Sequence, residues 1–180
     1  RDGSWLVKRL RSAGGAHIRP LDGTAPKPRE GLEYLQRRAI GPSGSAVFVA
    51  SRGTARLRGI TRQWIGHQGE PFGYLGSVGP VRVTTEARRL LQSMGAILAS
   101  RFGLRGLFGV DFVLSEGVPW PTEVNPRYSA SVEVLEFATG RSLLFEHARA
   151  FEEVSGEGWH SKCSDPIDQR VGKVIVYAPV

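Results

Sequence analysis

The stretch of sequence that decides the fold is residues 109–127, which reads G-V-D-F-V-L-S-E-G-V-P-W-P-T-E-V-N-P-R. Apolar side chains at positions 110, 112 and 114 alternate with other residues, which indicates a strand with one apolar face. Turn-forming residues follow at 115–117, and a second strand returns through residues 120–125. The stretch therefore predicts a β-hairpin with two different faces.

One face of this hairpin gathers oxygen-bearing side chains. A three-residue loop at 116–118 would place Asp111 opposite Glu123, with Asn125 further along the same face, whereas a slip of one residue would separate them. Two facing carboxylates repel each other, and a divalent cation held by oxygen ligands, Mg²⁺ or Mn²⁺ rather than Zn²⁺, removes that repulsion. Arg127 is placed to stabilise charge on a phosphate. The alternative is an ordinary hairpin with a solvated polar face, because short motifs often arise by chance.

Composition indicates a globular protein. The chain has 180 residues, of which 41% are hydrophobic and 23% charged, enough for a substantial core. No apolar run approaches the length of a membrane span and no secretory leader opens the chain, so we expect a cytoplasmic protein without a membrane partner. Cys163 is the only cysteine, and the four histidines show no metal-ligand spacing. Both ends fall next to expected strands, so we also expect a piece of a longer protein.

The charge is strongly basic and dominated by arginine. The net charge is +7, and only four of the 24 basic residues are lysines. Guanidinium groups match phosphate oxygens well, which suits nucleotides and, in principle, nucleic acids. The arginines are spread along the chain without a basic tract, a pattern more typical of a solvated surface. An Arg-rich nucleic-acid-binding domain is therefore a minor alternative.

Most of the chain reads as short strands. Lys8 ends the first strand and precedes a run of small residues with Gly14 and Gly15, whose backbone amides can fold over an anion, although a plain turn is the alternative. Pro and Gly residues indicate a loop at 20–31. Expected strands or extended stretches are 5–8, 32–40, 45–50, 56–65, 72–83 and 171–177, with a loop at 155–170.

Three segments are predicted to be helical. The clearest is 84–102, where apolar residues follow helical spacing, Thr84 or Thr85 can cap the start and Gly103 can end it. We expect it to cover the sheet that carries the hairpin. Residues 129–137 and 142–154 are two further helices. In the first of these, Glu133 and Glu136 share a face that could meet a cationic substrate, although a solvated face is the more ordinary interpretation.

Three motifs together resemble the ATP-grasp superfamily: W-L-V-K followed by A-G-G, then Y-L-Q-R-R-A-I-G-P-S-G-S, then G-V-D-F and E-V-N-P-R. The chain looks closest to carboxylase-like carboxylate–amine ligases related to biotin carboxylase and carbamoyl phosphate synthetase, and it also resembles tyramine–glutamate ligases. The resemblance implies an α+β fold in which two α+β lobes, built mainly from antiparallel sheets, clasp a nucleotide, incomplete here at both ends. Residues 1–40 would belong to the lid lobe with the phosphate loop and hinge. Residues 41–155 would form the C-terminal lobe with the metal site, and 156–180 a loop and strand leading into a truncated segment.

The resemblance also implies roles for individual residues. Lys8 matches a strand lysine that contacts nucleotide phosphates, and Gly14 and Gly15 match the loop that closes over them. Ser45 lies near the position that faces the ribose. The hinge whose backbone holds adenine is matched by Gln36, Arg37, Arg38 and Ala39, the magnesium ligands by Asp111, Glu123 and Asn125, and the arginine that steadies the transferred phosphoryl group by Arg127.

Three departures from the family pattern stand out. Gln36 and Arg37 replace the acidic residues usual in the hinge, only one phosphate-binding lysine is visible, and these 180 residues do not include the amino-terminal substrate domain. The resemblance implies an ATP-dependent ligase that binds Mg-ATP, or Mn-ATP, and activates a carboxylate as an acyl phosphate for attack by an amine. A homodimer is a further expectation. The alternative is a catalytically idle nucleotide-binding module, since this segment alone is expected to be inactive.

Overall fold

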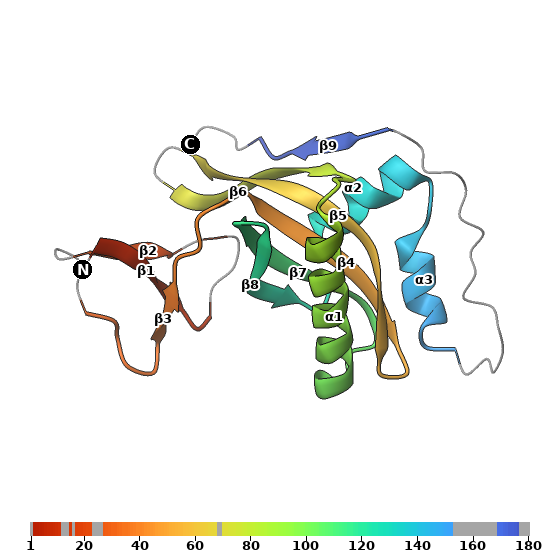
Figure 1. The fold of residues 1–180 in the computed structure, drawn as a ribbon, viewed down its shortest axis with the longest axis horizontal. Coiled ribbons are helices and arrows are strands. Elements are labelled where there is room, and N and C mark those ends of the chain that lie inside the picture. Colours follow the sequence, from red (N-terminus) through yellow and green to blue (C-terminus); the bar gives the residue numbers. More distant parts are fainter. Residues whose placement is uncertain are drawn as a thin grey trace.

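The computed structural model describes residues 2–11, 15, 17–22, 27–67, 70–152 and 169–176. Within them, strands form one three-stranded sheet with the order β2-β1-β3 and one six-stranded sheet with the order β8-β7-β4-β5-β6-β9. Figure 1 shows the small sheet lying beside the end of the large sheet where β6 and β8 lie, with the helices packed on the large sheet. The predicted α+β class with mainly antiparallel sheets is confirmed.

The small sheet contains a strand that the sequence analysis assigned to a loop. Its strands are β1 (Asp2–Arg9), β2 (Arg19–Asp22) and β3 (Glu33–Arg37). The prediction of a loop from residue 20 is wrong at its start, because Pro20 lies within β2 and pairs with Leu6. β2 is an edge strand, where the missing N–H of proline need not cost a ladder bond.

The large sheet is built around β4, which is buried on both faces. Every residue from 44 to 50 is buried, and alternate side chains join two separate cores, with Phe48 in one and Val47 and Val49 in the other. The period of two along a strand explains this division. The strands are β4 (Ser43–Ser51), β5 (Thr54–His67), β6 (Glu70–Gly79), β7 (Gly106–Ser115), β8 (Val118–Asn125) and β9 (Val171–Val174).

Helix α1 (Thr85–Phe102) covers one face of the large sheet (Figure 1). The Thr84 hydroxyl accepts a hydrogen bond from the backbone N–H of Ala87, and Gly103 ends the helix in a left-handed conformation, so the predicted helix and caps are confirmed. Phe48 and Phe108 stack in the core beneath it with their ring centroids 5.0 Å apart. No helix in the described part of the chain has the length and apolar character needed to cross a membrane.

Helices α2 (Ala130–Thr139) and α3 (Leu143–Arg149) pack on the opposite face. Their buried side chains, including Val132 and Leu135, meet the β4 residues that point away from α1. Helix α3 is shorter than the predicted segment 142–154. Among the described residues after its end, Phe151 lies in a turn and Glu152 has no regular structure.

The hairpin of β7 and β8 reaches its predicted pairing by a different route. The loop has two residues, Glu116 and Gly117, with φ angles of 50° and 80°, as expected for a type I′ turn, so the predicted three-residue loop is wrong. A register shift then places Thr122 between the pairs 112–121 and 111–123. This bulge offsets the shorter loop, and Asp111 still lies opposite Glu123.

The two sheets meet at two close backbone contacts. A Cβ atom on Gly41, in the connection between the sheets, would lie 2.1 Å from the carbonyl oxygen of Leu114. A Cβ atom on Gly15, in the connection between β1 and β2, would lie 1.9 Å from the carbonyl oxygen of Phe72 on β6. Only glycine permits either approach. The change of sheet falls at residues 38–42, while the domain boundaries drawn from the sequence stay predictions.

Candidate functional site

A row of polar side chains crosses four neighbouring strands on one face of the large sheet. Asp111 pairs with Glu123 on β8 and with Ser45 on β4, and Ser45 pairs in turn with Thr61 on β5. Residues directly opposite each other in a sheet point to the same face. The same face carries Val47 and Val49 further along β4, so the row continues the surface on which α2 and α3 pack.

Hydrogen bonds draw three of the predicted site residues together. The Asn125 amide nitrogen donates to Asp111 Oδ2 at 3.2 Å, and Arg127 Nη2 donates to Asn125 Oδ1 at 3.2 Å. Gln63 Nε2 donates to the other oxygen, Oδ1, of Asp111 at 3.2 Å. The Asp111 carboxylate is thus held from both sides, and Glu123 faces it across the strand pair with its side chain exposed.

The environment of Asp111 disfavours its charged form. Burial raises the pKa of the Asp111 carboxyl, and the neighbouring Glu123 carboxylate raises that pKa further. Hydrogen bonds from Ser45 and Gln63 and the charge of Arg127 lower the pKa, but desolvation is the largest effect. A buried carboxylate opposite a second carboxylate gains from a nearby cation.

The donor set fits Mg²⁺ or Mn²⁺ in chemistry and in number. Two carboxylates and one carboxamide are oxygen donors, and Mg²⁺ usually takes few protein ligands and completes its shell with water and phosphate oxygens. The described residues contain no group of three or more His, Cys, Asp or Glu side chains that could hold a metal by themselves. The Asn125 N–H against Asp111 supplies part of the positive charge that a cation would bring, and a half-turn of this carboxamide would present its oxygen instead.

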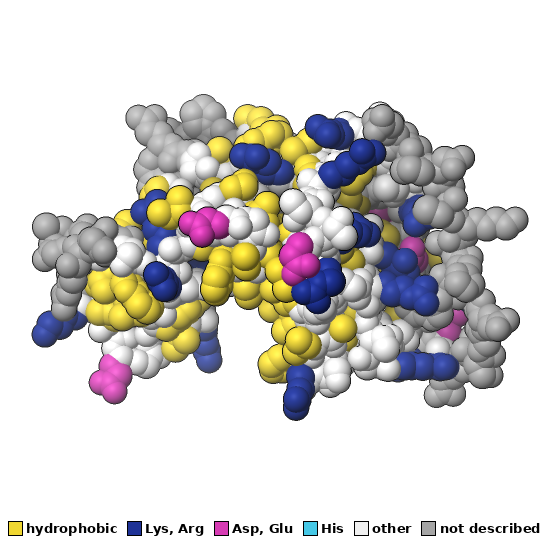
Figure 2. Space-filling view, in the orientation of Figure 1, with side chains coloured by type: hydrophobic (Ala, Val, Ile, Leu, Met, Phe, Trp, Pro, Cys, Tyr) yellow, Lys and Arg dark blue, Asp and Glu magenta, His cyan; other side chains and the backbone are white. Residues whose placement is uncertain are grey.

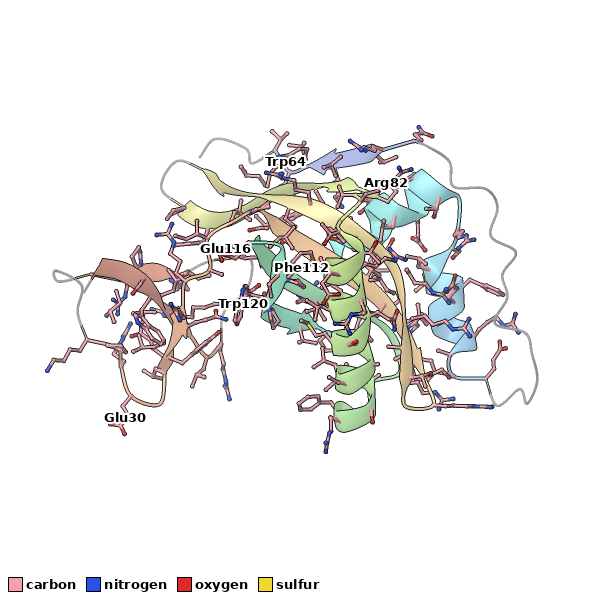
Figure 3. The ribbon with its side chains drawn as sticks, viewed as in Figure 1. Glu30, Trp64, Arg82, Phe112, Glu116 and Trp120 are labelled. Carbon is pink, nitrogen blue, oxygen red and sulfur yellow. The ribbon has the colours of Figure 1, made fainter. Side chains whose placement is uncertain are left out.

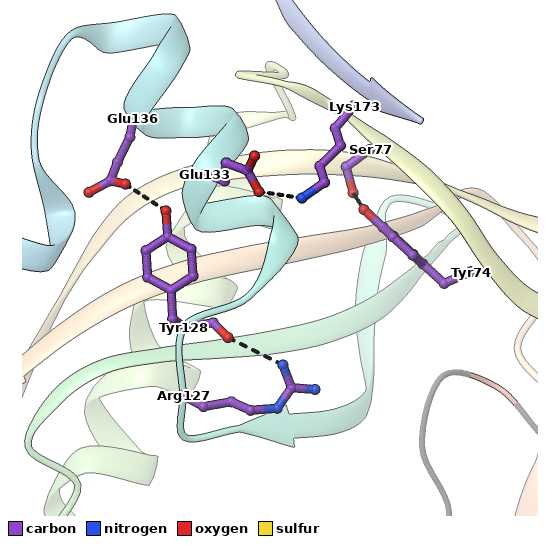
Figure 4. Close-up of polar contacts among 7 residues, drawn as sticks. All are labelled: Tyr74, Ser77, Arg127, Tyr128, Glu133, Glu136 and Lys173. Atoms are coloured by element: carbon purple, nitrogen blue, oxygen red, sulfur yellow. Dashed lines mark hydrogen bonds and ion pairs between the residues drawn. The ribbon is translucent and has the colours of Figure 1, made fainter. Parts of the chain in front are cut away.

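Arg127 is held by the loop that joins β8 to α2. Its Nη1 donates to the backbone oxygen of Tyr128 at 3.2 Å, and the Tyr128 hydroxyl donates to Glu136 Oε2 at 2.6 Å (Figure 4). The other oxygen of Glu136 accepts a hydrogen bond from the backbone N–H of Leu144 at 2.9 Å. The tyrosine therefore ties the arginine loop to both helices on this face.

The predicted nucleotide-binding residues lie on the small sheet and the connection after it. Lys8 Nζ donates to Gln36 Oε1 at 3.1 Å, so these two side chains share a face. Arg37 pairs with Trp5 on the alternate face. The backbone N–H of Arg38 donates to the Ser4 carbonyl at 2.8 Å.

The other residues predicted to contact the nucleotide lie in different environments. Ala39 is half-buried in the connection between the sheets. Gly15 has a φ of 85°, and Gly14 lies outside the described residues. Ser45, expected near the ribose, is buried and hydrogen-bonded to Asp111. Its contact with a ribose, like the roles of the other site residues, stays a prediction.

The surface is hollowed between the small sheet and α1, and hydrophobic side chains line both sides of the hollow (Figure 2). Trp120 extends from β8 toward the small sheet (Figure 3), and 55% of its surface is exposed. An exposed tryptophan at this position offers a flat apolar surface beside the polar row.

Sequence reasoning missed several residues of this site. Gln63 contacts Asp111 across 48 positions of sequence, and no local pattern marks it. Tyr128 directly follows the E-V-N-P-R motif, and this position next to Arg127 is the one feature of the sequence that could have indicated its role. The Ser129 hydroxyl is shielded from solvent without a hydrogen-bond partner in the described part of the chain, next to Gly109 on the same face.

Comparison with known proteins identifies the class. A sequence model described as ATP-grasp domain matches residues 2–131 of the 180, and the chain belongs to the ATP-grasp family. It is 33% identical over 92 residues to the carbamoyl phosphate synthase large chain of Pasteurella multocida (strain Pm70), covering 50% of this chain and 9% of that protein. The resemblance stated from the motifs is confirmed at the level of the family.

Solved structures share the fold. An ATP-grasp superfamily protein from Archaeoglobus fulgidus superposes with a TM-score of 0.64 at 24% identity, covering 83% of this chain and 45% of the other. A second match is the biotin carboxylase domain of 2-oxoglutarate carboxylase from Hydrogenobacter thermophilus, solved as a dimer with MgADP, ADP and bicarbonate. Its TM-score is 0.65 at 19% identity, covering 82% of this chain and 36% of the other. L-amino acid ligase from Bacillus licheniformis gives 0.62 at 16%, covering 81% and 38%. The chain spans less than half the length of each of these relatives.

Proposed function

We propose that this chain is the nucleotide- and metal-binding part of an ATP-dependent ligase that joins a carboxylate to an amine. The observation that carries the proposal is the convergence of Asp111, Asn125 and Arg127 through hydrogen bonds, with Glu123 opposite Asp111. Membership of the ATP-grasp family supports ATP as the nucleotide. Similarity to carbamoyl phosphate synthase and to an amino acid ligase supports the class of reaction.

The proposed metal site uses Asp111, Glu123 and Asn125 to hold Mg²⁺ or Mn²⁺, which would neutralise charge on the ATP phosphates when bound. Arg127 donates from the same face, where its guanidinium fork matches oxygens of the transferred phosphoryl group. Lys8 lies on the small sheet and would add a point charge once it leaves Gln36. Binding by these side chains orients the γ-phosphate for in-line attack.

The proposed reaction proceeds in two displacements. An oxygen of the substrate carboxylate attacks the γ-phosphorus, the bond to the β,γ-bridging oxygen breaks, and ADP leaves with that electron pair. The nitrogen of a neutral amine then attacks the carbonyl carbon of the acyl phosphate, loses a proton and expels inorganic phosphate. Neither step needs a covalent bond to the protein. The residues named above have the roles of binding, orientation and charge stabilisation.

The test is product analysis on the full-length protein. We expect ADP and phosphate to be released only when Mg²⁺, a carboxylate and an amine are all present. Asp111→Asn and Glu123→Gln should each lower this turnover by about 10²–10³-fold, as is typical for loss of one electrostatic stabiliser, while the circular dichroism spectrum stays unchanged. Full turnover in both variants would exclude the assignment.

A second candidate is nucleotide binding without turnover. It is favoured by the engagement of Lys8 with Gln36, because the ammonium group that the ligase needs for the phosphates is already paired. This candidate predicts a joint rise in melting temperature with ADP and Mg²⁺ but no product with any substrate pair. The ligase proposal also includes four predictions made from the sequence: the adenine contacts of the hinge, the domain boundaries, a cytoplasmic location and a homodimer.

A further inference from the structure

The polar row continues beyond the candidate metal site toward β9. Gln63, which donates to Asp111, lies directly opposite Ser77 on β6, and Ser77 lies directly opposite Lys173 on β9. Directly opposite residues share one face of the sheet. A continuous line of polar side chains therefore leads from Asp111 to the far edge of the large sheet.

At its end this row meets the first turn of α2. Lys173 Nζ forms an ion pair with Glu133 Oε2, and the Tyr74 hydroxyl shares a 2.7 Å hydrogen bond with the buried Ser77 hydroxyl. Figure 4 shows these four side chains together in the close-up that includes Arg127. The electrostatic environment of Tyr74 links the two regions. Burial raises the pKa of Tyr74, Lys173 lowers it, and the charges of both Asp111 and Glu133 raise it.

The Glu133–Lys173 pair is well suited to exchange. Both side chains retain about a third of their solvent exposure, 37% for Glu133 and 35% for Lys173. Ion pairs with this exposure contribute little net stability, because solvent screens them and the long lysine side chain loses conformational freedom. Glu133 is the shorter side chain and is fixed on a helix, whereas Lys173 reaches it from an edge strand on a flexible stem. Glu133 is therefore the group that keeps its place when the pair opens.

We propose that Glu133 is the binding group for an ammonium-bearing substrate, with the Lys173 ammonium occupying that position until the substrate displaces it. This inference rests on the proposed ligase function and names the chemistry of one substrate. One ammonium replaces another against the same carboxylate, so the exchange costs little beyond binding itself. The Arg127 end of the face receives the anionic phosphoryl group, and the Glu133 end receives the positive charge.

The ammonium belongs either to the attacking amine, which must lose one proton before its nitrogen can attack, or to an amino group on the carboxylate substrate. The probes separate these sources. Ethylamine, benzylamine and putrescine carry ammonium without carboxylate, and the twenty proteinogenic amino acids carry both. The controls are the fully N-acetylated derivatives, which have no ammonium group; those of arginine and histidine are left out because their side chains keep a basic nitrogen. Each is added to the full-length protein with ADP and Mg²⁺, and binding is measured by the rise in melting temperature.

Four proteins are compared: wild type, Glu133→Gln, Lys173→Met and the control Glu86→Gln. Glu86 matches Glu133 because it too lies in the first turn of a helix and forms an ion pair, with Arg89. We expect at least one ammonium probe to stabilise wild type and the control equally. The affinity of Glu133→Gln for that probe should be at least about tenfold lower than that of wild type. Lys173→Met should bind the same probe up to about fivefold more tightly, because the internal competitor is gone.

A purely structural ion pair between β9 and α2 predicts a different pattern. Both Glu133→Gln and Lys173→Met would then lower the melting temperature of the unliganded protein. The two variants would not shift the affinity for the probe in opposite directions. The inference is overturned if no probe stabilises wild type, if Glu133→Gln binds as well as wild type, if Lys173→Met fails to bind more tightly, or if the N-acetyl derivatives bind equally well.

Turnover separates this inference from the function on which it rests. The expected binding pattern without ADP release from any substrate pair would refute the ligase function and leave the ammonium site standing. ADP release that depends on an amine, with the same KM for that amine in wild type and Glu133→Gln, would refute the ammonium site and leave the ligase function standing.

Discussion

At the scale of single residues, Asp111 is where burial and function oppose each other. Its carboxyl is surrounded by donors from Asn125, Gln63 and Ser45, yet desolvation and the Glu123 charge still raise its pKa. A site built for stability alone would place an apolar or neutral side chain here. The unrelieved carboxylate is therefore a cost to the unliganded protein that a bound cation would offset.

This cost predicts a pH dependence for the protein without nucleotide or metal. Because the folded pKa of Asp111 is raised above its ordinary value of 3.8, the folded state binds this proton more tightly than the unfolded state. The free energy of unfolding should therefore rise as pH falls through the raised pKa, and the gain should be complete below 3.8. In urea unfolding across this pH range, the free energy of unfolding of wild type should rise relative to that of Asp111→Asn as pH falls. In a Glu123→Gln background the gain should shrink, since one cause of the shift is removed; a pH-independent difference would contradict this account.

At the scale of elements, the loop from β8 to α2 connects the site to its supports. Burial and the Glu136 carboxylate both raise the pKa of Tyr128, so its hydroxyl keeps its proton and donates to Glu136. Glu136 also accepts from the backbone of Leu144 at the start of α3. The position of Arg127 thus depends on contacts that Tyr128 and Glu136 make with α2 and α3.

Removing the Tyr128 hydroxyl tests this connection. Tyr128→Phe should lower the free energy of unfolding by only about 0.5–1 kcal/mol, because the residue is partly exposed. Turnover by the full-length protein should fall several-fold, while stabilisation by ADP and Mg²⁺ stays as in wild type. Tyr34→Phe, which removes a hydroxyl from the small sheet, is the control and should leave turnover unchanged. Equal turnover in the two variants would show that Tyr128 does not position Arg127.

Helix α1 depends on close contact with β4. A Cβ atom on Gly95 would lie 2.3 Å from a ring carbon of Phe48, which is fully buried and stacked on Phe108. Gly95→Ala should therefore destabilise the protein by about 1–3 kcal/mol through overpacking, despite the better helix propensity of alanine. Ser93→Ala on the exposed side of α1 should change stability by less than about 0.5 kcal/mol. The free energies of unfolding of both variants are measured by urea unfolding. A Gly95→Ala variant more stable than wild type would show that Phe48 can move aside.

At the scale of the whole molecule, the sequence predicted what local chemistry determines. The caps of α1, the strands and the approximate bounds of the hairpin follow from nearby residues. The pairing of Asp111 with Glu123 was predicted from a wrong loop, and only the bulge at Thr122 restored it. Contacts across many residues stayed out of reach, because no local pattern records which strands become neighbours. Gln63 on Asp111 and Lys173 on Glu133 are two such contacts.

The approach of the two sheets gives the last prediction. The connection after β1 reaches β6 only because Gly15 has no side chain, since a Cβ atom there would lie 1.9 Å from the Phe72 carbonyl oxygen. Gly15→Ala should push this connection away from the large sheet and weaken the binding of ATP by full-length protein about tenfold or more.

Gly31 provides a matched control in the other connection of the same sheet. Its φ of 71° is close to the 85° of Gly15, but a Cβ atom there would meet nothing within 4 Å. Gly31→Ala therefore imposes similar backbone strain, about 1 kcal/mol, without blocking the approach. Titration of both variants with Mg-ATP separates the two effects. Weaker binding in Gly15→Ala alone would establish that nucleotide is held where the small sheet touches β6, whereas equal binding in the two variants would place it elsewhere.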